Sequence, residues 1–284
     1  MHDLLAKPAA ATIASDMIRF FPALARPRPS GAARTVTVLA ALLAAPLPAL
    51  SQTPEPALDP AAVDLVREAS AFLTGQQRIS VDWFVSYDEV IDGREKLTNL
   101  RSGSNLLDRE GGFRAYAEEG ERIREYIFDG ATITAVHVDE NAYASAPAAG
   151  SFGDLVATLQ DNYDLALPIW QILARDSDQG LLDEAESGAY LGLTRVAGEL
   201  AHHLAFSSYD HDWQLWIAAD PDRPVLLMLV GTDPHTQGWP QYRAYFSNWD
   251  FEPEVTEDTF TFVPDDGMDQ MAWPRVGHSD EGNQ

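Results

Sequence analysis

The sequence predicts a mainly β protein of the α+β class: a curved antiparallel half-barrel of about ten or eleven strands, with helices lidding its concave face. Short segments of alternating apolar and polar residues follow one another at regular spacing, separated by tight turns. An N-terminal segment and a central block have helical spacing instead. Because a sheet with this many strands curls strongly, we expect the helices to lie on its concave side.

The first 51 residues have the composition of a secretory signal peptide. Arg26, Arg28 and Arg34 precede an apolar run at 35–47, and small residues after the run suit cleavage following Ser51. The run is shorter than the roughly 20 residues that span a bilayer, so we expect no integral membrane segment in the mature chain. The start codon is either Met1 or Met17. These features predict a soluble protein exported to the periplasm.

The domain prediction has four parts: a signal peptide at 1–51, a Pro-rich lead-in at 52–58, one domain at 59–273 and a polar tail at 274–284. The chain contains 44 acidic and 19 basic residues, and its net charge is −25. Such a charge repels nucleic acid and anionic membrane surfaces. Since there is no cysteine, disulfides, thiolate nucleophiles and thiolate metal ligands are excluded.

The mature chain begins with a predicted helix. Asp59 suits its N-cap, Pro60 its first position and Gly75 its stop, and Val63, Val66, Ala69, Phe72 and Leu73 form its apolar stripe. Six strands are expected next, at 79–87, 96–107, 113–119, 122–128, 131–139 and 141–147. They form a meander, in which the Asp92-Gly93 pair predicts a type I′ turn.

A helical block interrupts the strands. Ser151 suits the N-cap of a helix over 152–163, whose stripe is Phe152, Leu155, Val156 and Leu159. A second short helix is expected within 165–176 and a helical turn at 179–187. Because the block is too apolar for an exposed loop, we expect it to cover an open face or mouth of the sheet.

Strands resume at 188–198 and continue through the hairpin 198–217, then at 225–232, 243–251 and 258–264, the last with Phe260 and Phe262 inward. In the hairpin, Leu200, His202, Leu204 and Phe206 share one parity of the first strand, and Trp213, Leu215 and Ile217 share one parity of the second. This alternation predicts a half-buried antiparallel pair.

Seven segments of the chain resemble, in the same order, a family of predicted periplasmic proteins, domain-of-unknown-function family 2092. They are YDEVIDGREKL, YIFDGATIT, ALPIWQIL, YLGLTRVAG, HHLAFSSYDHDWQLWI, PQYRAYFSNWDF and FTFVP. The resemblance covers roughly Asp59 to Met271, and the hairpin is its most specific part. It implies a fold similar to the LolA and LolB lipoprotein carriers, with an apolar cavity for acyl chains. The family implies no established activity and no catalytic residues. The acidity of this chain argues against direct lipoprotein delivery, whereas it leaves apolar-ligand binding open.

The histidines of the hairpin are the main candidates for chemistry. His202 and His203 point to opposite faces of a strand and cannot share a metal; a zinc site would need His203, His211 and an aspartate to converge. We expect a partly buried His202 with a carboxylate or carbonyl partner, and Asp210, His211 and Asp212 exposed at the tip. No G-x-S-x-G, P-loop or G-x-G-x-x-G motif occurs. We therefore predict no catalytic residue, no metal and no cofactor.

The candidate ligand-binding residues are the apolar and aromatic side chains assigned to the concave face. They are Trp83, Phe113, Phe128, Ile169, Trp170, Leu173, His202, Phe206 and Trp213, with Ile172, Trp216, Leu227 and Tyr245 as further members. Composition does not distinguish a hollow half-barrel from a filled one. The predicted function is a non-enzymatic binding protein or carrier for an acyl chain, lipid or other apolar ligand. The alternatives are an envelope sensor or interaction module with an acidic surface, and a metal-dependent hydrolase centred on the hairpin.

Overall fold

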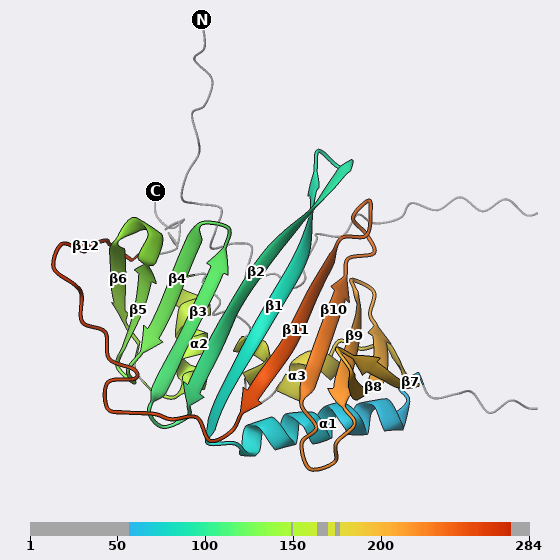
Figure 1. Cartoon of the computed structure of the whole chain (residues 1–284). Helices are drawn as coiled ribbons and strands as arrows, with labels where there is room; N and C mark the ends of the chain where they lie inside the picture. Colours follow the sequence, from blue (N-terminus) through green and yellow to red (C-terminus); the bar gives the residue numbers. More distant parts are fainter. Residues whose placement is uncertain (1–56, 149, 164–169, 174–176, 274–284) are drawn as a thin grey trace, which may run out of the picture.

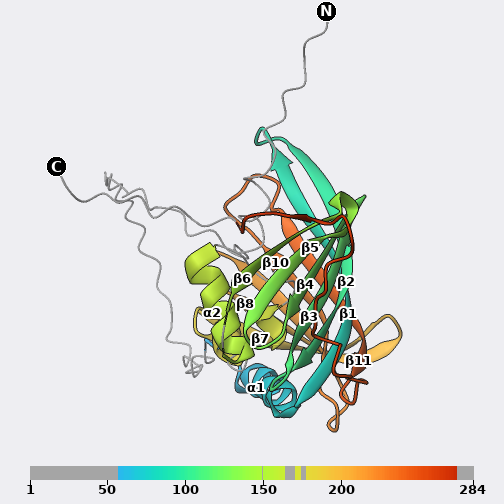
Figure 2. The same cartoon turned by 90° about the vertical axis from the view of Figure 1, so that its left-hand side faces the viewer.

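The structure is a computed structural model that describes residues 57–148, 150–163, 170–173 and 177–273. One twelve-stranded sheet forms its body, and the helices lie on the concave side of this sheet (Figures 1 and 2). The predicted fold class is confirmed, with twelve strands in place of ten or eleven. The predicted signal peptide and polar tail lie outside the described residues.

Helix α1 (Pro60–Gly75) has the predicted bounds. The side chain of Asp59 accepts a hydrogen bond from the Ala61 backbone N–H at 2.9 Å, which satisfies one of the free donors of the first turn. The buried side of the helix is formed by Ala62, Val66, Ala69, Ser70 and Leu73. Helix α1 lies below the half of the sheet that the later strands of the chain form (Figure 1).

The predicted meander follows α1. It comprises β1 (Arg78–Ile91), β2 (Glu95–Asp108), β3 (Gly112–Glu119), β4 (Arg122–Phe128), β5 (Thr132–His137) and β6 (Ala142–Pro147), with the 3-10 helix η1 (Val138–Glu140) between the last two. Asp92 and Gly93 have φ angles of 51° and 66°, as a type I′ turn requires. The long β1–β2 hairpin extends beyond the neighbouring strands (Figure 1).

The helical block contains α2 (Phe152–Tyr163), the 3-10 helix η2 (Trp170–Leu173) and α3 (Ser177–Leu182). Ser151 and Asp154 bond reciprocally at the start of α2: the Ser151 N–H donates to the Asp154 carboxylate at 2.8 Å and the Asp154 N–H donates to the Ser151 hydroxyl at 3.3 Å. All four residues of the predicted α2 stripe are buried.

The remaining strands are β7 (Ser187–Val196), β8 (Glu199–Ser207), β9 (Asp212–Ala218), β10 (Leu226–Thr232), β11 (Gln241–Asp250) and β12 (Asp269–Gln270). The order across the sheet is β12-β6-β5-β4-β3-β2-β1-β11-β10-β9-β8-β7. Strands β6 and β7 therefore lie near opposite edges, and the chain between them has to cross the sheet. Its described helices lie on the concave side (Figure 2).

The prediction of a strand over 258–264 with inward phenylalanines is wrong. This segment forms turns, in which the Thr261 N–H donates to the Asp258 carbonyl at 3.1 Å. It packs on the convex face: Arg114 donates to the Thr259 carbonyl at 3.2 Å, and Phe262 lies against Tyr143 with ring centroids 5.1 Å apart. The alternating phenylalanines thus cover the outer side of the sheet, and their segment forms no strand of it. Local periodicity does not reveal such a contact, because it joins segments that are distant in the chain.

Candidate functional site

The candidate site is the concave face of the sheet beneath the helices. Residues directly opposite each other on paired strands point to the same face, so the register defines rows across it. One row is Phe206, Trp213, Gly231, Tyr242 and Tyr87, from β8 to β1. The next is Leu204, Leu215, Leu229, Ala244, Val85 and then Arg101 on β2. The face is therefore apolar over five strands and becomes polar at β2.

Six of the nine predicted ligand-binding residues belong to one buried cluster between the sheet and the helices: Trp83, Phe113, Phe128, Leu173, Phe206 and Trp213. Each is at most 4% exposed. The ring of Phe113 lies 4.9 Å from that of Phe152 on α2, which shows how closely the helical layer packs. These side chains are therefore covered on nearly all sides by the sheet and the helices.

The other predicted members have different positions. Ile169 lies outside the described residues, and so does the side chain of Trp170. Ile172 and Leu227 belong to the buried cluster. His202 pairs with the buried Ile217 and is half-buried; its Nδ1 lies 3.0 Å from the Tyr190 hydroxyl. The partner of His202 is thus a phenol, whereas the sequence led us to expect a carboxylate or carbonyl.

The convex face holds two residues that were predicted to face the concavity. Trp216 stacks on His203 at 4.3 Å, and Tyr245 lies 6.3 Å from Phe84. A row of Phe84, Tyr245, Met228, Trp216 and His203 crosses five strands on this side. The prediction that Trp216 and Tyr245 face the concavity is wrong. Each of them alternates along its strand with residues that point to the concave face, so it points to the convex face. The separation of His202 and His203 onto opposite faces is confirmed.

His211 is also placed differently from the prediction. Asp210 and Asp212 are exposed as expected, but His211 is only 3% exposed and lies 5.1 Å from the Trp213 ring. Burial lowers the pKa of His211 to about 4, so it is neutral near pH 7. His203 and His211 do not form the zinc site considered from the sequence: within the described ranges, no three or more His, Asp or Glu side chains are grouped to hold a metal ion.

A polar cluster that the sequence reading missed lies where the apolar rows reach β1, β2 and β3. The Tyr87 hydroxyl donates to Glu119 Oε1 at 2.5 Å, Arg101 Nη2 donates to the Tyr87 oxygen at 3.1 Å, and Arg101 Nε lies 3.0 Å from Glu119 Oε2. Burial, followed by the hydrogen bond to Glu119, raises the pKa of Tyr87 to about 12. Two further tyrosines, Tyr126 and Tyr242, pack on the core beside it, and burial raises the pKa of each.

The sequence did contain a signal for this cluster. In β2, Arg101 and Asn105 share the parity of the buried Leu107 and lie opposite Val85 and Val81. Polar residues on the apolar parity of a strand need partners on that face. Asn105 accepts a hydrogen bond from the Trp83 indole at 3.1 Å. The partners of Arg101 are Tyr87 and Glu119, as described above.

Arg109 links the sheet to the helical layer. It donates to the carbonyls of Leu73 and Gln76 at the end of α1, at 3.1 and 2.9 Å, and to the carbonyl of Leu173 in η2 at 3.2 Å. Free carbonyls at a helix C-terminus carry partial negative charge, so a guanidinium stabilises them. Ser70 and Asp178 join α1 to α3 through hydrogen bonds of 3.3 Å.

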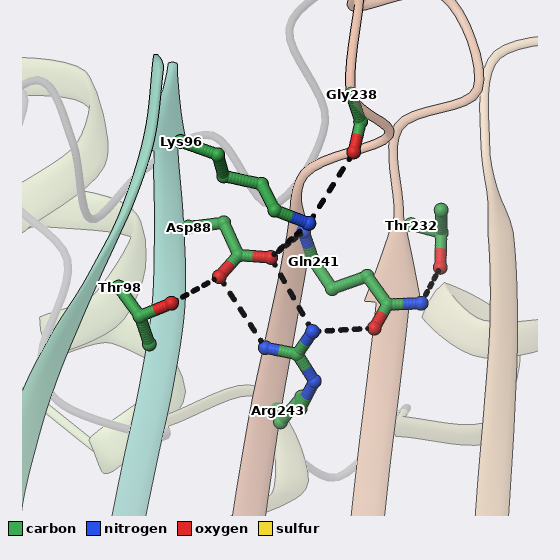
Figure 3. A network of polar contacts seen from close by, with 7 residues as sticks. All are labelled: Asp88, Lys96, Thr98, Thr232, Gly238, Gln241 and Arg243. Carbon is green, nitrogen blue, oxygen red and sulfur yellow. Dashed lines mark hydrogen bonds and ion pairs between the residues drawn. The ribbon is translucent and has the colours of Figure 1, made fainter. Parts of the chain in front are cut away.

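A second polar network surrounds Asp88 on the other side of the sheet (Figure 3). Asp88 accepts from Thr98 at 2.8 Å and from the Gln241 N–H at 3.0 Å, and it lies within 3.4 Å of Lys96 and Arg243. Burial alone would raise the pKa of Asp88, but these hydrogen bonds and the Arg243 charge hold it below its usual value. The carboxylate is 1% exposed and fully engaged, which is typical of a structural clamp.

The family model that describes predicted periplasmic proteins of the DUF2092 family matches residues 62–272. The chain belongs to this family. The resemblance noted in the sequence is thereby confirmed, and so is the expected periplasmic location of this DUF2092 protein. No curated protein sequence matches the chain. No helix among the described residues is long and apolar enough to cross a membrane.

Several solved structures are similar to this DUF2092 protein. LprF from Mycobacterium bovis has 12% identity over 72% of this chain and 99% of its own, with a TM-score of 0.44. An uncharacterized conserved protein from Thermus thermophilus has 13% identity over 75% and 99%, with a TM-score of 0.39. A LolA superfamily protein from Nitrosomonas europaea has 12% identity over 71% and 97%, with a TM-score of 0.34. Similarity of this degree assigns no ligand to the chain.

Proposed function

We propose that this DUF2092 protein is a non-enzymatic periplasmic binding protein or carrier for an acyl chain or a similar apolar ligand. The observation that carries the proposal is the apolar concave face, which five consecutive strands form and short helices cover. Each methylene that a ligand buries there would contribute about 0.8 kcal/mol. The acidic surface keeps such a protein soluble while its apolar face is in use.

The way in which the helical layer is held supports ligand exchange. The described helices α2 and α3 and the 3-10 helix η2 belong to the crossing between β6 and β7, and none of them is part of the ladder. Arg109 bonds the end of β2 to η2, and Ser70 and Asp178 bond α1 to α3 within the helical layer. Moving this layer would expose the rows that contain Phe206 and Leu204 while leaving every strand pair intact.

Native mass spectrometry of protein purified without detergent tests the proposal, together with uptake of a fluorescent fatty acid. We expect either a co-purified apolar molecule or saturable uptake. Phe206→Ala, on the concave face, should weaken uptake several-fold through lost apolar contact. Phe84→Ala is its matched control, since Phe84 is 43% exposed on the convex face. A clean unliganded mass combined with no uptake would refute the proposal.

A second candidate function is recognition of an envelope protein through the convex face. The row from Phe84 to His203 favours it, because Phe84 and Tyr245 expose 43% and 37% of their surface. Exposed aromatic side chains that line up across strands are typical of binding surfaces. Recovery of one partner from envelope extracts by wild-type protein, and its loss with Phe84→Ala and Tyr245→Ala, would support this function. Recovery of the same amount of partner by wild type and by both variants would show that the convex row does not bind it.

A further inference from the structure

We propose that Arg101 and Tyr87 form a headgroup site for the carboxylate of a single-chain amphipathic ligand, a site at which the Glu119 carboxylate lies in this structure. This inference rests on the proposed acyl-chain binding and adds the chemistry of the polar end. The ligand it describes is a long-chain carboxylic acid, with its chain along the apolar rows and its ionised head at β2.

Position is the first argument. The row that ends at Arg101 holds five apolar side chains, each at most 8% exposed, and the neighbouring row ends with Tyr242 and Tyr87. From β8 to β2 there are five strand spacings, or about 24 Å, enough for a long extended acyl chain. Strand β1 starts near α1 and runs to the hairpin, so Tyr87 and Arg101 lie on the hairpin side of the buried cluster (Figure 1).

The chemistry of the cluster is the second argument. The Tyr87 hydroxyl donates to Glu119 Oε1 at 2.5 Å, and the Arg101 guanidinium forms an ion pair with the same carboxylate, with Nε 3.0 Å from Oε2. Charge-assisted donors of this kind are suited to planar carboxylates. The guanidinium of Arg101 also lies 4.7 Å from the centre of the Tyr87 ring, which fixes its direction. With a pKa raised to about 12, the Tyr87 hydroxyl stays protonated near neutral pH, where a carboxylic acid is ionised, and so remains a donor there.

Glu119 is placed so that it can leave. It is the last residue of β3, directly before Gly120, whose φ of 59° marks the tight turn to β4. The carboxylate of Glu119 is 25% exposed, compared with 17% for the Arg101 side chain. A rotation about its side-chain bonds would bring Glu119 into water at the tip of the β3–β4 hairpin. A ligand carboxylate would then pair with the Arg101 guanidinium and accept the hydrogen bond of Tyr87 in its place. The exchange replaces one carboxylate by another, so the charge at the site is unchanged.

The test compares ligands with the same chain and different heads: dodecanoate, 1-dodecanol and dodecyl phosphate, titrated at pH 8 by tryptophan fluorescence. Wild type should bind dodecanoate about fivefold or more tightly than dodecanol. Glu119→Gln removes the internal competitor's charge, so it should increase dodecanoate affinity several-fold and leave dodecanol affinity unchanged. The Arg101→Gln/Glu119→Gln double variant leaves no unpaired charge and should bind both ligands equally.

The matched control is Arg114→Gln/Glu125→Gln. Arg114 and Glu125 form a similar cross-strand pair, at 2.8 Å on β3 and β4, but on the convex face. This control should retain wild-type discrimination. Equal binding of acid and alcohol by wild type would overturn the headgroup site while leaving apolar binding intact, and binding of neither would overturn both. Preference for dodecyl phosphate over dodecanoate would overturn the carboxylate assignment. If the double variant loses both ligands, unchanged dodecanoate affinity in Glu119→Gln would still overturn the proposal.

Discussion

Gly103 lies on the concave parity of β2, directly opposite Trp83, and its replacement by alanine should be severely destabilising. An added Cβ would lie 2.0 Å from the Tyr116 carbonyl oxygen and 2.4 Å from the Trp83 ring. Neither obstacle yields easily. Tyr116 belongs to β3, which is paired on both sides, and the Trp83 indole is 3% exposed and bonded to Asn105.

Overpacking of this kind typically costs 1–3 kcal/mol, and with a backbone obstacle we expect about 3 kcal/mol. For a chain of this size such a loss lowers Tm by roughly 6–12 °C. Urea denaturation followed by circular dichroism measures the change, and tryptophan fluorescence should report displacement of Trp83. Gly75→Ala is the control, because nothing lies within 4 Å of its added Cβ. A Gly103→Ala variant within about 0.5 kcal/mol of wild type would refute the packing argument.

Three further outcomes are expected. Arg109→Met should lower stability by about 1–3 kcal/mol and speed fatty-acid uptake, because the helices lose their link to β2; Arg195→Met, which loses one exposed hydrogen bond, should change neither. Asp88→Asn should lower the free energy of unfolding by about 2 kcal/mol at pH 7. The folded pKa of Asp88 is lowered, so this difference should be complete above about pH 5 and shrink below about pH 4 in urea titrations. Ala197→Gly should raise stability by about 0.5–1 kcal/mol in thermal melts, since Ala197 has a φ of 50°; no gain would show that the turn carries no strain.

The local elements were largely predictable from the sequence. Helices α1 and α2 begin directly after Asp59 and Ser151, and α1 ends at the predicted stop, Gly75. The type I′ turn at Asp92-Gly93 and the opposite directions of His202 and His203 also follow from short stretches of chain. Capping, turn geometry and strand parity depend on neighbours within a few residues, which is why sequence patterns report them.

Other features were accessible only in part. The buried apolar parity of the hairpin was recognised, yet Trp216 was assigned to the wrong face although it alternates with Leu215 and Ile217. Arg101 belongs to no local motif, because its partners Glu119 and Tyr87 are 18 and 14 residues away in the chain and on other strands. His211 lies against Trp213, and Glu184, which precedes β7, lies 3.7 Å from its ring; both contacts depend on the tertiary structure.

The sequence by itself determined most of the helices and strands, the apolar character of one sheet face and the membership of the DUF2092 family. Only the tertiary structure decided that β11 pairs with β1, that the helical block has to cross between the two edge regions, and that residues 258–264 cover the convex face. It also brought Arg101, Glu119 and Tyr87 together from three strands at the end of the apolar rows. Such contacts join residues distant in the chain, and their geometry depends on the register and curl of the whole sheet.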